Sequence, residues 1–347
     1  MRKGLLLFIS VIISALLLVA CNQESPEKVS SKENDKENAN EEKNSNRTVY
    51  PLEIEINDAQ GNTYTQTFEK APERVVTNNP SSIEILLELG LEDKIVGILN
   101  PDNEIKGKHA ETIAKLHNLG DKKTVSRETI VGMKPDIVVG RSVMFNDDNI
   151  GSITTLNEFN INVYSQSASH INQNPKLTSV IDDVLTLGKI FDVNDRAEAY
   201  AAELQARYDK IVENTKENKT DEKLTVLAMA RFDTDAGTFS NFIISQGLQK
   251  DAIEVLNLES AIEGSNGGLN YESLISTNPD IILYITADRN IEFDSKAIET
   301  LLSEPLIKDV SAIKEGRIYE TTYDDFMDYG VRIFDTVEML SNELYGK

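Results

Sequence analysis

One phrase occurs twice in the sequence, and it limits the folds open to the chain. Residues 128–139 read ETIVGMKPDIVV and residues 272–283 read ESLISTNPDIIL, with Glu, an aliphatic residue, Pro, Asp and Ile in the same register. Proline ends a helix and pushes the residue before it towards extended geometry, and the apolar run that follows fits a strand buried on both faces. Each half of the chain is therefore expected to contain a helix that leads directly into a buried strand.

Short β-rich runs alternate with helical stretches around both phrases, as in parallel α/β sheets. The runs that we interpret as strands of the two sheets are residues 74–77, 94–98, 136–140, 161–164, 224–230, 280–285 and 317–321. Ahead of them, residues 52–56 and 64–68 flank a turn-rich segment and predict an edge hairpin. Helices are expected over residues 82–89 and 332–344.

A long helical stretch separates the two halves. From residue 192 to about 216, apolar side chains recur at three- and four-residue spacing, at Ala197, Ala201, Leu204, Tyr208 and Ile211. A helix of about 24 residues is roughly 36 Å long. It either crosses from one lobe to the other, which would restrict hinge motion to small angles, or belongs to one lobe.

The first twenty residues predict a removable secretion signal. Two basic residues precede an apolar run over residues 5–19, and small residues precede Cys21. A helix that stays in the membrane needs about 20 apolar residues, whereas serines interrupt this run. Cys21 is the one cysteine of the chain, so no disulfide is expected. Its position is that of a lipidated residue, which predicts a lipid anchor at the outer face of a cell membrane, of Gram-positive type.

The chain after Cys21 divides by composition. Residues 21–48 are rich in Asn, Glu, Lys and Ser, which is typical of a disordered tether. The net charge of -23 falls on the body that follows and argues against a nucleic-acid partner. That body is close to the size at which single cores stop growing, so we expect two lobes. The expected segments are an N-terminal lobe over residues 49–172, a connecting helical segment over 173–217 and a C-terminal lobe over 218–347.

Taken together, these features resemble the substrate-binding proteins of ABC importers for iron-siderophores, haem and cobalamin. The resemblance is carried by Cys21, residues 71–76 (APERVV) and 82–90 (SIEILLELG), the repeated phrase, the connecting helix and residues 254–256 (EVL). It covers residues 50–347. It implies two α/β lobes with mainly parallel, Rossmann-like sheets joined by one long helix, and a ligand cleft between the lobes. It also implies a monomer that delivers its ligand to a permease dimer.

Three arginines follow predicted strands, namely Arg141, Arg231 and Arg289. Ligands of open α/β sheets bind at the carboxyl ends of the strands, and guanidinium binds anionic oxygens without competing for iron. We therefore expect the arginines to hold an anionic Fe(III)-siderophore, with no metal ligand from the protein itself. For any single arginine, the alternative is a surface ion pair. An organic ligand also needs apolar walls, for which the candidates are Phe145, Phe239, Tyr323, Phe326, Met327 and Tyr329.

Other ligands and activities remain as alternatives. A haem protein of this family is expected to ligate iron with histidine, or with methionine and histidine. This chain has three histidines, of which His109 and His117 lie in a polar, lysine-rich segment and His170 is expected to form hydrogen bonds. Cobalamin is the other alternative within the family. An exported enzyme is a further one, but the sequence contains no Gly-rich phosphate loop, no G-x-S-x-G and no H-E-x-x-H motif.

The resemblance also implies how the protein docks to the permease. Members of the family dock through one glutamate on an outward-facing helix of each lobe. The matching positions are Glu84 and Glu254, each among aliphatic residues. The alternative for either is an ordinary solvated glutamate.

Overall fold

The computed structural model describes residues 46–264 and 267–346. From Asn46 onwards they belong to one compact unit. The secretion signal, Cys21 and most of the expected tether lie outside the described residues. Thr48, assigned to the tether above, contacts the body, because its backbone N–H donates to Asp192 Oδ1 at 2.8 Å. Among the described helices, none is both long enough and apolar enough to cross a membrane.

The N-terminal lobe is built on a four-stranded sheet with the order β4-β3-β5-β6, in which all neighbours are parallel. Its strands are β3 (Val75–Thr77), β4 (Ile95–Ile98), β5 (Ile137–Gly140) and β6 (Asn162–Ser165). The helices of this lobe are α2 (Pro80–Glu88), α3 (Ala110–Ile113), α4 (Arg127–Gly132) and α5 (Ile153–Glu158).

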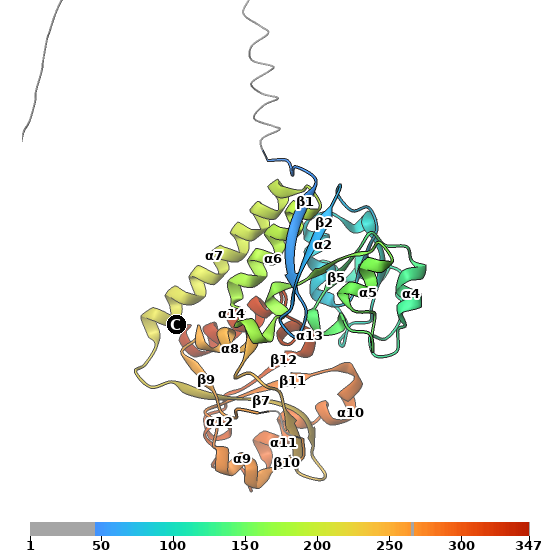
Figure 1. Ribbon diagram of the computed structural model, residues 1–347. Helices are drawn as coiled ribbons and strands as arrows, with labels where there is room; N and C mark the ends of the chain where they lie inside the picture. The colour runs from blue at the N-terminus through green and yellow to red at the C-terminus, as the bar shows by residue number, and fades with distance from the viewer. Residues whose placement is uncertain (1–45, 265–266, 347) are drawn as a thin grey trace, which may run out of the picture. The chain divides into compact units, whose positions relative to one another are not determined.

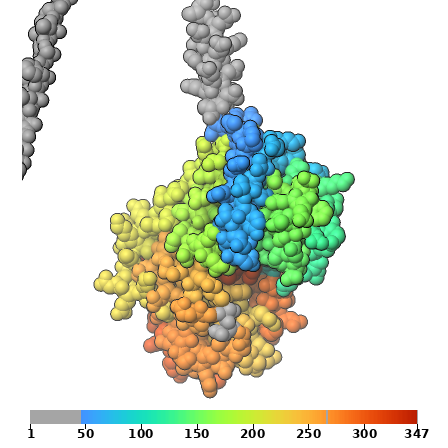
Figure 2. Space-filling model, in the orientation of Figure 1, coloured from blue at the N-terminus to red at the C-terminus, as the bar shows by residue number. Residues whose placement is uncertain are grey.

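The expected hairpin forms a two-stranded antiparallel sheet of its own from β1 (Leu52–Asn57) and β2 (Thr63–Phe68). Asp58 shapes its turn, because Oδ1 accepts the backbone N–H groups of Gln60 and Asn62 at 2.9 and 2.8 Å. The Gln66 side chain then accepts the Val163 N–H at 2.8 Å and fastens the hairpin to β6. Figure 2 shows the hairpin, in blue, on the surface of the lobe.

Two packed helices follow the first lobe, α6 (Leu177–Ile190) and α7 (Asn194–Asn218). Near the start of α7, Arg196 Nη1 donates to the Leu89 carbonyl of the N-terminal lobe at 2.9 Å. Near its end, Asn214 Nδ2 donates to Ser341 Oγ at 2.9 Å. Ser341 belongs to the final helix, α14 (Ile333–Tyr345), which lies beside α7 in Figure 1. The long helix therefore contacts both lobes, which agrees with the first interpretation of the sequence, a helix that crosses from one lobe to the other.

The C-terminal lobe contains a mixed sheet with the order β10-β8-β7-β11-β12, and β9 pairs with β7. Pairing is parallel among β7, β9, β11 and β12 and antiparallel for β8 with β7 and with β10. The strands are β7 (Leu224–Asp233), β8 (Thr238–Asn241), β9 (Leu258–Ser260), β10 (Leu269–Asn270), β11 (Ile281–Thr286) and β12 (Ile318–Thr322). The remaining helices are α8 (Gly247–Glu254), α9 (Tyr271–Thr277), α10 (Ile291–Asp294), α11 (Ala297–Ser303), α12 (Ser311–Lys314) and α13 (Tyr323–Phe326).

Alternation along β11 shows how this sheet is buried on both faces. Leu283 and Ile285 pack into a core that continues through α7 and α14 to the N-terminal lobe. Ile282 and Tyr284 pack into a second core on the opposite face. Because successive side chains of a strand point to opposite faces, a strand covered on both sides is apolar throughout.

The repeated phrase forms the same structure in both lobes, a helix that leads into a buried strand, as the sequence predicts. The residue before each proline is left-handed, however, and not extended as expected, with φ 49° at Lys134 and 43° at Asn278. The aspartate after each proline then binds the start of the neighbouring strand. Asp136 Oδ2 accepts the Arg74 N–H at 3.0 Å, and Asp280 Oδ2 accepts the Thr225 N–H at 2.9 Å. The aspartate of the phrase therefore aligns two adjacent strands.

Candidate ligand-binding site

Arg141, one of the predicted ligand donors, lies buried where the lobes meet. It directly follows β5 and is 7% exposed. Its Nη1 lies 3.7 Å from Oδ1 of Asp328, which follows α13 in the C-terminal lobe. Burial opposes the charge on the guanidinium, but Asp328 and Tyr323 outweigh it and raise the pKa of Arg141. Arg141 is therefore held as a buried cation between the lobes.

A second predicted donor, Arg289, shares a carboxylate with a lysine that the sequence analysis did not select. Arg289 follows β11, Lys122 comes from the N-terminal lobe, and both form ion pairs with Asp102. Both cations also lie over the ring of Tyr323, with the Arg289 guanidinium carbon 5.2 Å and Lys122 Nζ 5.5 Å from its centre. Aromatic faces attract cations, so Tyr323 is surrounded by cations from both lobes.

Two aspartates of the C-terminal lobe bind backbone N–H groups of the N-terminal lobe. Asp324 Oδ2 accepts the N–H groups of Asp102 and Asn103, both at 2.8 Å. Asp328 Oδ2 accepts the N–H of Ser81 at 2.8 Å, in the first turn of α2, where a helix has no partners of its own for its N–H groups. We refer to the following six residues as the interlobe cluster: Asp102, Lys122, Arg141, Arg289, Asp324 and Asp328.

The two buried aspartates of the cluster are harder to ionise than free carboxyl groups. Burial raises the pKa of Asp328 to about 7, with Arg141 opposing the rise and Asp324 adding to it. Burial also raises the pKa of Asp324, against the hydrogen bond from Asn103 and the charge of Lys122. The two carboxylates disfavour each other's charge, as close like charges do.

Arg231, the third predicted donor, has different surroundings. The strand that precedes it is longer than expected, so Arg231 lies within β7, at an irregularity where its φ is 50°. Its side chain is exposed, and the guanidinium carbon lies 5.1 Å from the centre of the Phe293 ring. Among the described residues, Arg231 takes no part in the ion pairs that hold the interlobe cluster together.

The predicted aromatic walls separate into two groups. Tyr323 and Tyr329 are half-buried beside the cluster, and both appear among the groups that set the pKa of Arg141. The prediction is wrong for Phe145, Phe239 and Phe326, which are only 3, 2 and 0% exposed and pack in the hydrophobic cores.

Met327 is also mostly buried, with 9% of its surface exposed. Phe239 lies in β8 and Phe326 in α13, not in loops. These apolar side chains are buried because burying them removes more apolar area from water than a lining position would.

Several residues of the site were missed by sequence reasoning, although two of them lie beside residues that it had selected. Asp324 and Asp328 belong to the stretch Tyr323–Gly330, and Lys122 to the loop after Gly120. Phe242, whose ring centroid lies 5.5 Å from that of Tyr323, was not selected either. The sequence feature that could have revealed the aspartates is the number of acidic residues near Tyr323, where residues 323–328 read YDDFMD. So many acidic residues are unusual beside a predicted anion site.

Glu84 does not lie on an outward face, and this part of the sequence prediction is wrong. It is 6% exposed, and its carboxylate accepts from Arg332 Nε at 2.8 Å and from Nη2 at 2.6 Å. Arg332 in turn contacts Asp325 at 3.0 Å. Helix α2 turns this residue towards the C-terminal lobe, where a fork-shaped guanidinium matches the carboxylate. Glu84 therefore ties the lobes together.

Glu254 remains compatible with the docking prediction. It is the last residue of α8, its side chain is 38% exposed, and its partner is Lys250, one helical turn earlier, at 3.9 Å. An exposed pair of this kind is weak and leaves the carboxylate open to competition by another cation.

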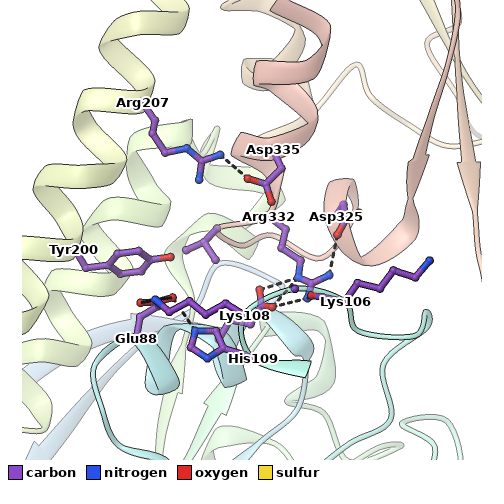
Figure 3. Close-up of a pocket in the computed structure, with 12 residues that line it drawn as sticks. Glu88, Lys106, Lys108, His109, Tyr200, Arg207, Asp325, Arg332 and Asp335 are labelled. Atoms are coloured by element: carbon purple, nitrogen blue, oxygen red, sulfur yellow. Dashed lines mark hydrogen bonds and ion pairs between the residues drawn. The ribbon is translucent and has the colours of Figure 1, made fainter. Parts of the chain in front are cut away.

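A cavity of about 370 Å³ lies next to the Glu84–Arg332 pair (Figure 3). Its walls come from α2, the loop over residues 106–109, α7 and α14. Figure 3 shows Arg332 bonded to Asp325 and Arg207 bonded to Asp335. Several charged residues of the lining form ion pairs with one another, such as Arg332 with Glu84 and Asp325, and Arg207 with Asp335.

The histidines lie apart from the interlobe cluster. His109 contacts Glu88 at 2.7 Å, and buried His170 contacts Ser165 at 2.9 Å, which is the hydrogen-bonding role predicted for it. Within the described part of the chain, no group of three or more His, Cys, Asp or Glu side chains is arranged to hold a metal ion. The chemistry of the cluster is therefore that of ion pairs and hydrogen bonds.

One known family profile covers the main sheets of both lobes and ends within α13. The profile, described as Periplasmic binding protein, matches residues 75–324. The chain belongs to this family. Its relatives include proteins that bind iron-chelate ligands for ABC transporters, and the two-lobed α/β architecture is the one expected from the sequence.

Members of the periplasmic binding protein family from several organisms are similar to this chain. An uncharacterized ABC transporter substrate-binding lipoprotein of Bacillus subtilis is 23% identical over 99% of this chain and 98% of its own length. The petrobactin-binding protein of the same organism is 23% identical over 92% and 90%. A cobalamin-binding protein of Halobacterium salinarum is 21% identical over 80% and 71%.

Among solved structures, a periplasmic binding protein from Veillonella parvula has the same fold. It superposes with a TM-score of 0.71 at 23% identity, over 86% of this chain and 93% of its own.

Proposed function

We propose that this periplasmic binding protein family member is the substrate-binding lipoprotein of an ABC importer that captures a ferric siderophore and delivers it to the permease. Cys21 is the proposed site of lipidation, which would hold the protein at the extracytoplasmic face of the membrane. The protein would bind and release its ligand as a monomer without chemical change.

The observation that carries the proposal is the interlobe cluster. Arg141 and Arg289 follow the strands β5 and β11, Lys122 lies in the loop between α3 and α4, and the three cations meet around Tyr323 where the two lobes face each other. Ligands of open α/β sheets bind at this edge. Guanidinium and ammonium groups interact with the iron-bound oxygens of a siderophore without displacing them.

Relatives support iron over the alternatives without excluding cobalamin. The petrobactin-binding protein matches this chain over more of its length than the cobalamin-binding protein does. Haem is less well supported. A haem bound at the cluster would need a histidine there as axial ligand, and His109 and His170 both lie outside the cluster. An enzyme would need a nucleophile or an acid–base pair in the site, and the relatives named above are binding proteins.

Direct titration tests the proposal. The full-length protein in detergent is dialysed against ferric trihydroxamate, ferric tris-catecholate, ferric citrate, haem and cobalamin, and the bound complex is measured by its visible absorbance. We expect one ferric complex to bind one to one with a Kd below about 1 μM, equivalent to about 8 kcal/mol. Tighter binding of haem or cobalamin than of every ferric siderophore would refute the proposed ligand class.

A variant pair identifies the site. Arg141→Ala removes a buried cation of the cluster and is expected to weaken binding by about 1.5 to 3 kcal/mol. Lys314→Ala, an exposed residue at the end of α12, removes the same charge from the surface and serves as the control. Arg231→Ala and Arg289→Ala then show whether the other two predicted donors contribute.

A further inference from the structure

The interlobe cluster carries as many carboxylates as cations. Lys122, Arg141 and Arg289 provide three positive charges, and Asp102, Asp324 and Asp328 provide three negative ones, which gives a net charge of zero when all are ionised. Each cation has its carboxylate in the same cluster. Asp102 contacts both Lys122 and Arg289, and Asp328 lies beside Arg141. The guanidinium groups are therefore already neutralised by the protein.

Protonation of Asp328 changes this balance only a little. Its carboxyl faces Ser81 and Asn79 of the α2 region, Arg141 after β5, Lys122, and Asp324 of α13. Because burial raises the pKa of Asp328 to about 7, the group is partly protonated at neutral pH. With Asp328 alone protonated, the cluster has one excess positive charge, against the three that an unneutralised set of cations would have.

Unpartnered polar atoms in and beside the cluster are mainly acceptors. Among the described residues, the buried side-chain atoms without a hydrogen-bond partner include three acceptors, Oδ1 of Asp324 and Asn103 and Oε1 of Gln166, against one donor here, Nε of Arg141. Oδ1 of Asp328 also has no hydrogen bond, but it lies 3.7 Å from Nη1 of Arg141. These atoms are contiguous, because Asn103 N–H binds Asp324, Ser81 N–H binds Asp328, and Gln166 Nε2 donates to Ser81 Oγ at 2.9 Å.

Buried acceptors without a donor are costly, so they favour a ligand that supplies one. A polyanionic ligand has the opposite properties. It would bring more acceptor oxygens to a surface that already has an excess of them, and it would place its charge next to Asp324 and Asp328, which are 3 and 1% exposed. Like charges brought together in a buried site repel strongly. It could reach the cations only by displacing their aspartates.

We infer that the ligand is a ferric siderophore complex of zero or low net charge that donates N–H or O–H hydrogen bonds to the aspartate side of the interlobe cluster. This inference rests on the proposed function and revises one part of the sequence expectation, which was an anionic complex held by three arginines. Asp324 and Asp328 are then the residues that discriminate against highly charged complexes.

The test compares two ferric complexes on the full-length protein in detergent. One is a neutral ferric trihydroxamate that carries amide N–H groups, and the other is a ferric tris-catecholate with three negative charges. Affinities are measured by equilibrium dialysis. We expect the neutral complex to bind at least about tenfold more tightly to the wild type. A tris-catecholate that binds tenfold more tightly than the neutral complex would overturn the inference and leave the proposed function intact. If neither of these complexes nor ferric citrate binds, the proposed function itself fails.

Variants test the role of the two aspartates. Asp324→Asn and Asp328→Asn remove a negative charge each while keeping the side-chain size. Each is expected to shift the ratio of the two affinities towards the tris-catecholate by about tenfold or more. Asp309→Asn makes the same charge change at an exposed surface position and should leave the ratio unchanged. Because the ratio is taken within each variant, partial unfolding of a variant does not affect it. An unchanged ratio in both variants would overturn the assignment of these aspartates.

Discussion

At the scale of single residues, the pair Glu84–Arg332 shows what the fold does with charge. Two nitrogens of Arg332 bind the carboxylate at 2.6 to 2.8 Å, and the two side chains are 8 and 15% exposed. The residues are far apart in sequence and belong to different lobes. A charge-assisted bidentate pair shielded from water is stronger than a surface pair, and loss of one partner leaves the other charge buried.

We therefore expect Glu84→Gln or Arg332→Met to reduce the free energy of unfolding by about 2 to 4 kcal/mol. The double variant should lose less than the sum of the two, with a coupling of about 1 kcal/mol or more, because it leaves neither Glu84 nor Arg332 charged without the other. Urea unfolding followed by tyrosine fluorescence measures all four proteins, since the chain has no tryptophan.

The exposed pair Lys250–Glu254 provides the matched control. Its side chains are 48 and 38% exposed, and its atoms are 3.9 Å apart. The same double-variant comparison should give a coupling of no more than about 0.5 kcal/mol. Purely additive losses at Glu84 and Arg332 would mean that the pair is not formed in solution.

At the scale of elements, the contact between α6 and α7 depends on one glycine. A Cβ added at Gly188 in α6 would lie 2.2 Å from the Cβ of Ala197 in α7, which is far too close. Gly188 lies in the α6 interior, where alanine would normally be the better helix former by about 1 kcal/mol. The close packing of the two helices therefore outweighs helix propensity at this position.

Gly188→Ala is expected to reduce the free energy of unfolding by about 1 to 3 kcal/mol, because the helices must move apart. Gly132→Ala, at the exposed end of α4, is the control, since nothing lies within 4 Å of the added Cβ. Thermal unfolding of both variants separates the cost of the closer packing at Gly188 from the gain in helix propensity that both substitutions share. A Gly188→Ala protein that is as stable as the wild type would show that the interface between α6 and α7 is looser than described.

At the scale of the whole molecule, polar contacts between the lobes add to the apolar core that runs from the C-terminal sheet through α7 and α14 to the N-terminal lobe. Carboxylates of the C-terminal lobe bind N–H groups at Ser81, Asp102 and Asn103, and Arg332 binds Glu84. Such contacts exchange for water more readily than a continuous apolar interface, so they suit lobes that must admit and release a ligand. A permease that received the ligand would compete with these contacts.

Glu254 is the remaining candidate for contact with the permease. We expect Glu254→Ala to keep wild-type affinity for the ferric complex and to lower its uptake in cells, because the residue lies on an exposed helix end outside the cluster. Glu299→Ala, also an exposed glutamate of the C-terminal lobe, is the control. Uptake assays and dialysis on the same variants separate docking from binding. Normal uptake by Glu254→Ala would argue against this docking position.

The sequence by itself determined the order and type of the main elements. The strands of the first lobe and the central strands of the second begin and end within a few residues of the expected positions, and the buried stripe Ala197, Ala201, Leu204 and Ile211 lies on α7 as predicted. These features depend on side-chain periodicity and on Pro and Gly, which act over a few residues. The short strands β8, β9 and β10 carried too little pattern to be recognised.

Only the tertiary structure decided which charged and aromatic residues face one another. Glu84 turned inwards because Arg332, distant in sequence, occupies the space opposite α2. Phe145 and Phe326 became core residues because the elements around them enclose them. Arg141 and Arg289 were recognisable as strand-end arginines, but their partners Asp328 and Asp102 come from the opposite lobe. The net charge of the site depends on residues that are distant in sequence and come together only on folding. A local sequence pattern therefore could not predict this net charge.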